Sequence, residues 1–73
     1  MKQADKDQII ETANERDFYL RIGTKKYAAK LAGKKCDYPM AWTRDEDGKD
    51  IDVQISWALA ARVATGETNV ITA

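Results

Sequence analysis

The stretch "PMAWTRDEDGKDIDVQIS", residues 39–56, carries the clearest structural signal in the chain. Its Asp47-Gly48 pair is favoured in the two-residue type I′ turn of a β-hairpin. With the turn at that pair, the apolar residues of both strands fall on one face: Met40, Trp42, Val53 and Ile55. Because the turn and the apolar pattern agree, the stretch predicts a hairpin in which Trp42 lies opposite Val53.

The opening of the chain predicts a helix followed by a strand. Residues 4–17 start near Asp5, a candidate N-cap, and place three apolar residues at helical spacing: Ile9, Ile10 and Ala13. Residues 17–24 alternate apolar and polar side chains at the period of a half-buried strand, with Phe18, Leu20 and Ile22 on one face.

A second helix is predicted over residues 25–32. Thr24 is typical of an N-cap and Gly33 of a C-cap, and alanines fill much of the segment between them. On a helical wheel, Lys26, Lys30 and Lys34 form a row at i, i+4 spacing, opposite the apolar residues. The row is interpreted either as a solvated helix face or as a contact surface.

After the hairpin, the chain predicts a helix and a last strand. "SWALAARVATG", residues 56–66, runs from the N-cap candidate Ser56 to the C-cap candidate Gly66, and residues 68–73 read as a short strand. A competing interpretation begins the helix at Val53 with Asp52 as its N-cap. That alternative would remove the hairpin.

These elements predict an α+β fold in one small domain over residues 1–73. An N-terminal helix precedes a βαββαβ order with a mostly antiparallel sheet. The arrangement is expected to be ferredoxin-like, or an irregular sheet with helices on one face. One such topology hosts many functions, so the fold alone does not name one.

Charge is balanced over the whole chain but not along it, since the chain has 12 basic and 12 acidic residues. Residues 18–36 contain six basic side chains and no acidic one, whereas residues 37–52 contain two basic and six acidic side chains. Opposed blocks of this kind can orient a protein partner or a second copy. A zero total disfavours strong long-range attraction to bulk nucleic acid or to a membrane.

The residue inventory offers little for catalysis. The chain has no histidine, which excludes Ser-His and Cys-His arrangements, and no glycine spacing matches a phosphate-binding loop. Cys36 follows two lysines that would favour a reactive thiolate, but a small side chain just past a helix is the simpler interpretation. An EF-hand loop aligned on Gly48 puts Thr43 and Gln54 where calcium ligands are required. No enzyme activity, cofactor or metal is expected.

The chain is expected to be cytoplasmic. It has a single cysteine, its first residues lack the apolar core of a secretion signal, and its longest apolar run covers only residues 57–61. No membrane association is therefore predicted. With 73 residues, folding hides only roughly 60% of the unfolded chain's surface, so the core is expected to be thin.

These observations favour a small, non-enzymatic protein-binding module, an adaptor or an inhibitor, that docks by charge complementarity on a larger protein or on a second copy. The expected contact residues are Arg21, Lys25, Lys26, Lys30, Lys34, Lys35 and Tyr38. Accessory proteins of phages or mobile elements are often of this kind, although no motif here carries that association. The alternative is weak, nonspecific nucleic-acid binding by the basic segment 21–35, which salt would abolish.

Overall fold

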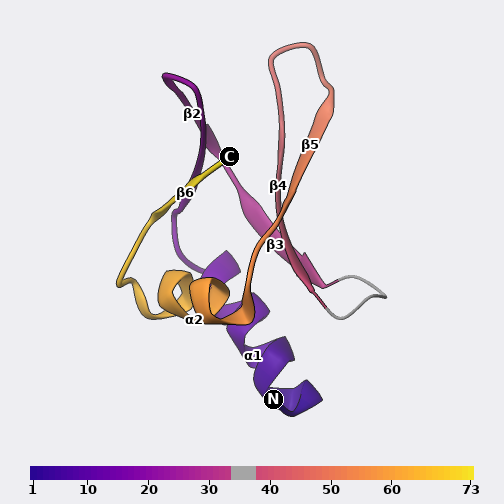
Figure 1. Ribbon diagram of the computed structural model, residues 1–73, viewed down its shortest axis with the longest axis vertical. Helices are drawn as coiled ribbons and strands as arrows, with labels where there is room; N and C mark the ends of the chain where they lie inside the picture. Colours follow the sequence, from indigo (N-terminus) through magenta and orange to yellow (C-terminus); the bar gives the residue numbers. More distant parts are fainter. Residues whose placement is uncertain (34–37) are drawn as a thin grey trace.

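The computed structural model describes residues 1–33 and 38–73 and has the expected α+β class. Along the chain, the described elements are α1 (Gln3–Asn14), β1 (Tyr19–Ile22), β2 (Lys25–Ala28), β3 (Lys30–Gly33), β4 (Pro39–Arg44), β5 (Asp50–Gln54), α2 (Trp57–Thr65) and β6 (Val70–Thr72). Figure 1 shows the two hairpin tips, β1–β2 and β4–β5, at one end of the molecule and both helices toward the other.

The strands form two three-stranded sheets, and the chain passes directly from β2 of the first sheet into β3 of the second. In the first sheet β1 lies between β2 and β6, antiparallel to β2 and parallel to β6; in the second, β4 lies between β3 and β5, antiparallel to both. β2 and β3 follow each other with only Ala29 between them. The hydroxyl of Thr43 on β4 donates a hydrogen bond of 2.7 Å to the carbonyl oxygen of Ala28, which ties the second sheet to the first.

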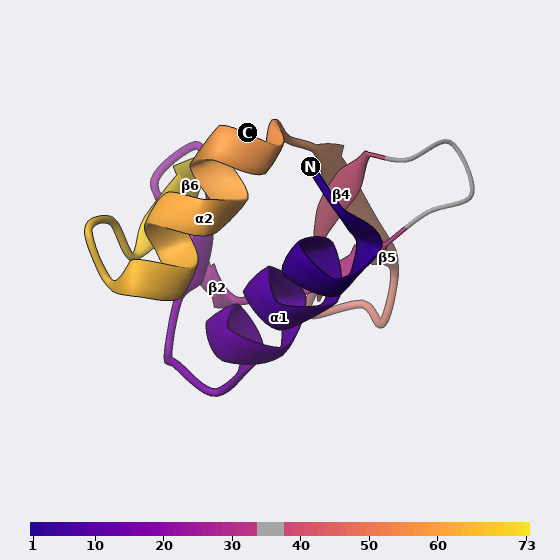
Figure 2. The ribbon, with the colours of Figure 1, turned by 90° about the horizontal axis from the view of Figure 1, so that it is seen from below.

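The core lies on the side of the sheets that the helices cover. Leu20, Leu31 and Ile71 are almost fully buried there, together with Ala13 of α1 and Val63 of α2. The two helices pack against each other, and α1 also packs on β3; Figure 2 shows both helices in front of the strands. The inner faces of both sheets are therefore occupied, and their outer faces carry exposed and half-buried side chains.

The predicted hairpin is present, but its register differs by one residue. Trp42 lies opposite Asp52, and Met40 lies opposite Gln54. The turn has three residues rather than two: the N–H of Asp45 donates to the carbonyl oxygen of Lys49 at 2.9 Å. Gly48 closes the turn at φ 81°, as in hairpin loops that end with a residue in the left-handed region.

The predicted helix over residues 25–32 is wrong, because this segment forms β2 and β3. Gly23 and Thr24 are the two-residue turn of the β1–β2 hairpin, and Gly23 has φ 63°. Burial then alternates, with Ala29 and Leu31 inside and Ala28 and Lys30 exposed. The βαββαβ order is wrong for the same reason, since a strand pair replaces the first of its helices.

The other elements follow the sequence more closely. α2 has Ser56 as its N-cap, whose side chain accepts a hydrogen bond of 3.1 Å from the N–H of Leu59, and Gly66 as its C-cap at φ 79°. Residues 50–54 are strand, so the competing helix start at Val53 is wrong. α1 begins earlier than expected: Lys2 is its N-cap and Asp5 lies inside its first turn.

Candidate functional site

The site is the solvent side of the second sheet, which we call the outer face and define by six residues: Lys30, Ala32, Met40, Trp42, Asp52 and Gln54. Strand register aligns them in two rows across the sheet. Lys30, Trp42 and Asp52 form one row, and Ala32, Met40 and Gln54 form the next. A cation, an aromatic ring and an anion therefore stand side by side in one row.

The centre of the outer face is apolar. Met40 and Trp42 are half-buried, yet neither belongs to the buried core cluster or to the partly buried residues that pack against it. By contrast, their neighbours Ala41 and Thr43 point inward and are buried. Met40 and Trp42 are thus large, half-buried apolar side chains on the solvent side of β4 that stay outside the core formed by the described residues.

Two outer-face charges remain available to a partner. Arg44 and Asp50 lie opposite each other in the row on the other side of Trp42 from Met40, and they already form an ion pair, with 3.1 Å between Nε and Oδ1. Lys30 and Asp52 are exposed, and neither forms an ion pair with another residue that the structure describes. They stand on the two strands that flank β4, so roughly 10 Å separates their backbones.

A basic flank, Arg21 and Lys26, lies on the solvent side of the first sheet. The two residues are directly opposite each other on β1 and β2. Hydrogen bonding of Ala29 to Phe18 fixes the alternation of the ladder, so Arg21 and Lys26 form a non-hydrogen-bonded pair, where side chains approach most closely. Like charges directly opposite each other destabilise a sheet.

The other expected contact residues lie apart from this arrangement. Lys25 is at the tip of the first hairpin, where its Nζ lies 2.9 Å from Oε1 of Glu46 at the tip of the second. The hydrogen bond and the charge of Glu46 raise the pKa of Lys25. Tyr38 is 50% exposed, just before β4. Lys34, Lys35 and Cys36 are outside the described residues, so the row of Lys26, Lys30 and Lys34 on a helix is replaced by Lys26 and Lys30 on strands.

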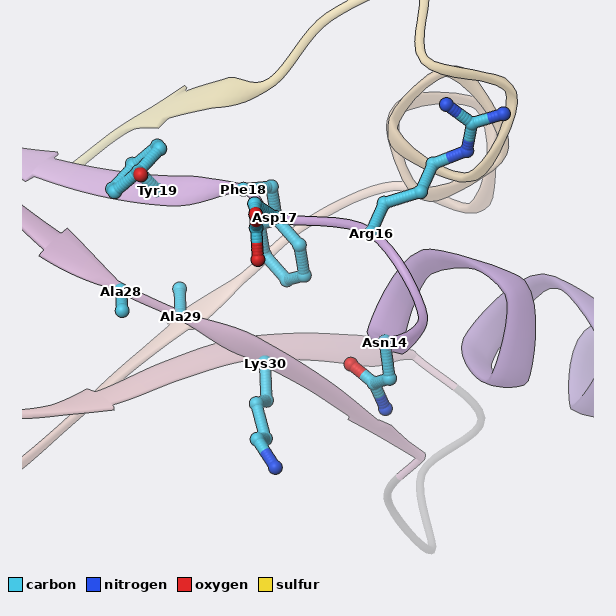
Figure 3. A pocket seen from close by; sticks show the side chains of 8 residues that line it. All are labelled: Asn14, Arg16, Asp17, Phe18, Tyr19, Ala28, Ala29 and Lys30. Carbon is cyan, nitrogen blue, oxygen red and sulfur yellow. The ribbon is translucent and has the colours of Figure 1, made fainter.

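A pocket of about 160 Å³ opens where β1 and β3 diverge, close to the end of α1. Figure 3 shows its lining side chains: Asn14, Arg16, Asp17, Phe18, Tyr19, Ala28, Ala29 and Lys30. Arg16 points toward α2 and Lys30 points the opposite way. The carboxamide of Asn14 is already hydrogen-bonded to Leu31. The polar groups of this pocket therefore do not converge on one ligand position.

Among residues 1–33 and 38–73, no group of three or more His, Cys, Asp or Glu side chains is placed to hold a metal ion. Within the same residues, no helix combines the length and the apolar character that crossing a membrane requires.

Sequence reasoning placed Lys30 in the site but missed Trp42 and Asp52. The two-residue turn assigned Trp42 to the core face, and the one-residue change in register moves it to the solvent side. The signal that finds it is Asp45, whose carboxylate oxygen accepts from the N–H groups of Asp47 and Lys49. An aspartate that bonds its own backbone two residues on marks the start of a turn.

Compared with known proteins, the chain matches no family model, no curated protein and no solved structure.

Proposed function

We propose that this chain is a small, non-enzymatic protein-binding module that docks through the outer face on a protein surface of complementary charge. The observation that supports this function best is the row of Lys30, Trp42 and Asp52. It combines a half-buried aromatic side chain outside the core with one charge of each sign. Aromatic residues at the centre of a contact supply much of its binding energy, and flanking charges set its orientation and association rate.

The mixed charge favours a protein over a nucleic acid. A phosphate backbone presents one sign of charge along its whole length. Lys30 on β3 would attract it, but Asp52 lies in the same row on β5 and would repel it. A folded protein can instead offer an acid opposite Lys30 and a base opposite Asp52.

In this role the chain acts by occupying a site on its partner, as an adaptor or an inhibitor does. The partner surface would carry an apolar patch that takes Trp42 and Met40, with charges of opposite sign on its two sides. Such a contact needs no cofactor and no catalytic side chain. Association would be faster at low ionic strength, because salt screens the charges that steer the encounter.

The experiment compares capture by the wild-type chain with capture by two variants. The baits are three tagged, immobilised proteins: wild type, Trp42→Ser and Glu11→Lys. Each is exposed to an extract of the cells that make the protein, to which untagged wild-type chain has been added. Glu11 is exposed on α1, remote from the outer face, and serves as the matched control. Proteins retained by wild type and by the control but lost from Trp42→Ser support the proposal.

Two results would contradict it. One is retention of the same proteins by all three baits. The other is retention of nothing by the wild type, the added chain included.

Weak nucleic-acid binding is the second candidate, and one observation favours it. The basic flank keeps two cations directly opposite each other, a pair that a sheet disfavours unless an anion lies between them. Tyr19 is 37% exposed on the same side of β1 and could stack on a base. Binding of this kind would be nonspecific and would weaken steeply with salt.

A further inference from the structure

We propose that the outer face pairs with the outer face of a second copy of this chain, about a twofold axis that runs along β4. In this arrangement Lys30 of each copy lies over Asp52 of the other, and the two Trp42 side chains meet at the axis. The inference rests on the proposed function and names the partner as the chain itself.

The order of the strands makes the face self-complementary. β4 is the middle strand, with β3 on one side and β5 on the other. When two copies of a sheet stack face to face about an axis along the middle strand, the flanking strands exchange, so β3 lies over β5 of the other copy. Residues of one row stay in that row. Lys30 and Asp52 share a row, so each meets its opposite charge.

The other twofold arrangement lacks this match. An axis across the strands would place β3 over β3 and β5 over β5. Lys30 would then approach the β3 strand of its copy, and Asp52 would approach the acidic β5 strand. Like charges brought together at an interface suppress association. The charge layout therefore selects the axis along β4.

The apolar residues lie where the selected axis needs them. In a twofold interface, a residue on the axis contacts its own copy. Met40 and Trp42 both lie on β4, are half-buried and stand outside the core cluster. Stacked sheets pack about 10 Å apart, a gap that side chains of this size fill from both sides. Arg44 also lies on β4, but Asp50 of its own chain neutralises it.

The size of the face sets the strength of the pairing. Three strands about 4.8 Å apart, each about five residues long, give a face of roughly 14 by 17 Å. A standard stable interface buries about 800 Å² of each partner, and this face is smaller than that. We therefore expect reversible association at high protein concentration rather than an obligate dimer.

The test uses two charge reversals that restore each other only across the proposed interface. Sedimentation velocity is measured on purified protein between about 10 μM and about 1 mM, the range expected for a weak contact. Wild type should shift from monomer toward dimer as concentration rises. Lys30→Asp alone and Asp52→Lys alone should each stay monomeric, because each homodimer would contain two like-charge contacts. An equal mixture of the two variants should regain the wild-type shift.

Two controls exclude other causes. Lys26→Asp makes the same kind of charge reversal on the first sheet and should associate as wild type does. Circular dichroism of each variant confirms that the fold is kept, which is expected because Lys30, Asp52 and Lys26 are all exposed. Trp42→Ser should weaken association without any change of charge.

Three results would overturn the inference. They are a wild type that stays monomeric over the whole range, reversals at Lys30 and Asp52 that associate as wild type does, and a mixture that does not recover. A monomeric wild type would refute pairing with itself only. Docking on a different protein would still be decided by the capture experiment with Trp42→Ser.

Discussion

The side-chain carboxamide of Asn14 forms two hydrogen bonds with the backbone of Leu31. Its Oδ1 accepts from the N–H of Leu31 at 2.8 Å, and its Nδ2 donates to the carbonyl oxygen of Leu31 at 3.0 Å. Asn14 is the last residue of α1, and Leu31 lies on β3, on the edge that faces away from β4. One side chain thus takes the place of a neighbouring strand and joins the helix to the sheet.

Asn14→Ala should therefore destabilise the fold by about 1 to 2 kcal/mol, because it leaves the part-buried N–H and C=O of Leu31 without their side-chain partner. Urea unfolding followed by circular dichroism measures the change. Gln8→Ala is the matched control, since Gln8 also loses a side-chain hydrogen bond, to Thr12, but at an exposed position. The control should change stability by less than about 0.5 kcal/mol. Equal effects of the two substitutions would refute the role of Asn14.

The outward position of Trp42 predicts an unusual tolerance. Trp42→Ser should lower stability by less than about 1 kcal/mol, since it removes cross-strand contacts but no core packing. Leu31→Ala, one row away and almost fully buried, should lower it by about 2 to 5 kcal/mol. Urea unfolding of both variants tests the register. A larger loss at Trp42 than at Leu31 would mean that Trp42 faces the core.

Alanine substitutions at Gly66 and Gly48 distinguish the stability cost of backbone strain from that of steric crowding. Both have positive φ, so alanine at either should destabilise by about 1 to 2 kcal/mol. A Cβ at Gly48 meets nothing within 4 Å, whereas a Cβ at Gly66 would lie 2.6 Å from the guanidinium of Arg16. Gly66→Ala should therefore lose somewhat more stability than Gly48→Ala in thermal unfolding. The excess should vanish in an Arg16→Ala background, and an excess that persists there would assign it to another contact.

The ion pair between Lys25 and Glu46 at the hairpin tips predicts that the stability of the fold falls at high pH. Because Glu46 holds the pKa of Lys25 above its ordinary value of 10.5, the pair stabilises the fold below that pH. The contribution is lost as pH rises through the raised pKa. Titration of the lysine side chains by NMR should show one lysine that titrates late and returns to the ordinary value in Glu46→Gln. No change in that variant would contradict the pairing. The effect on stability should be small, because both side chains are exposed.

Local signals predicted the elements whose ends are marked by side-chain chemistry. Ser56 and Gly66 define α2 because a hydroxyl N-cap and a left-handed glycine each satisfy backbone groups at the helix ends. The Asp47-Gly48 pair correctly indicated a hairpin. Its register was predicted wrongly, because Asp45 joins the turn through its carboxylate and lengthens the loop by one residue.

The error at residues 25–32 came from long-range pairing. Thr24 and Gly33 resemble helix caps, and the segment is rich in alanine, so local propensity favours a helix. In the structure, β1 pairs with its first half and β4 with its second, and tertiary pairing overrides weak propensity. Tyr27, Ala28, Leu31 and Ala32 share one face of a helical wheel, so the sequence pattern of so short a segment fits a helix as well as a strand. The link from Asn14 to Leu31 spans 17 residues and has no local signal at all.

Fluorescence anisotropy of labelled DNA and RNA of mixed sequence, titrated with the protein at low and at near-physiological salt, decides between protein docking and nucleic-acid binding. If the outer face serves protein docking, binding of DNA and RNA should be absent, or present only at low salt and lost when salt is added. Lys26→Asp should remove whatever low-salt binding exists, because it breaks the basic flank. Saturable binding that persists at near-physiological salt would contradict the proposed docking function and make the nucleic acid the partner.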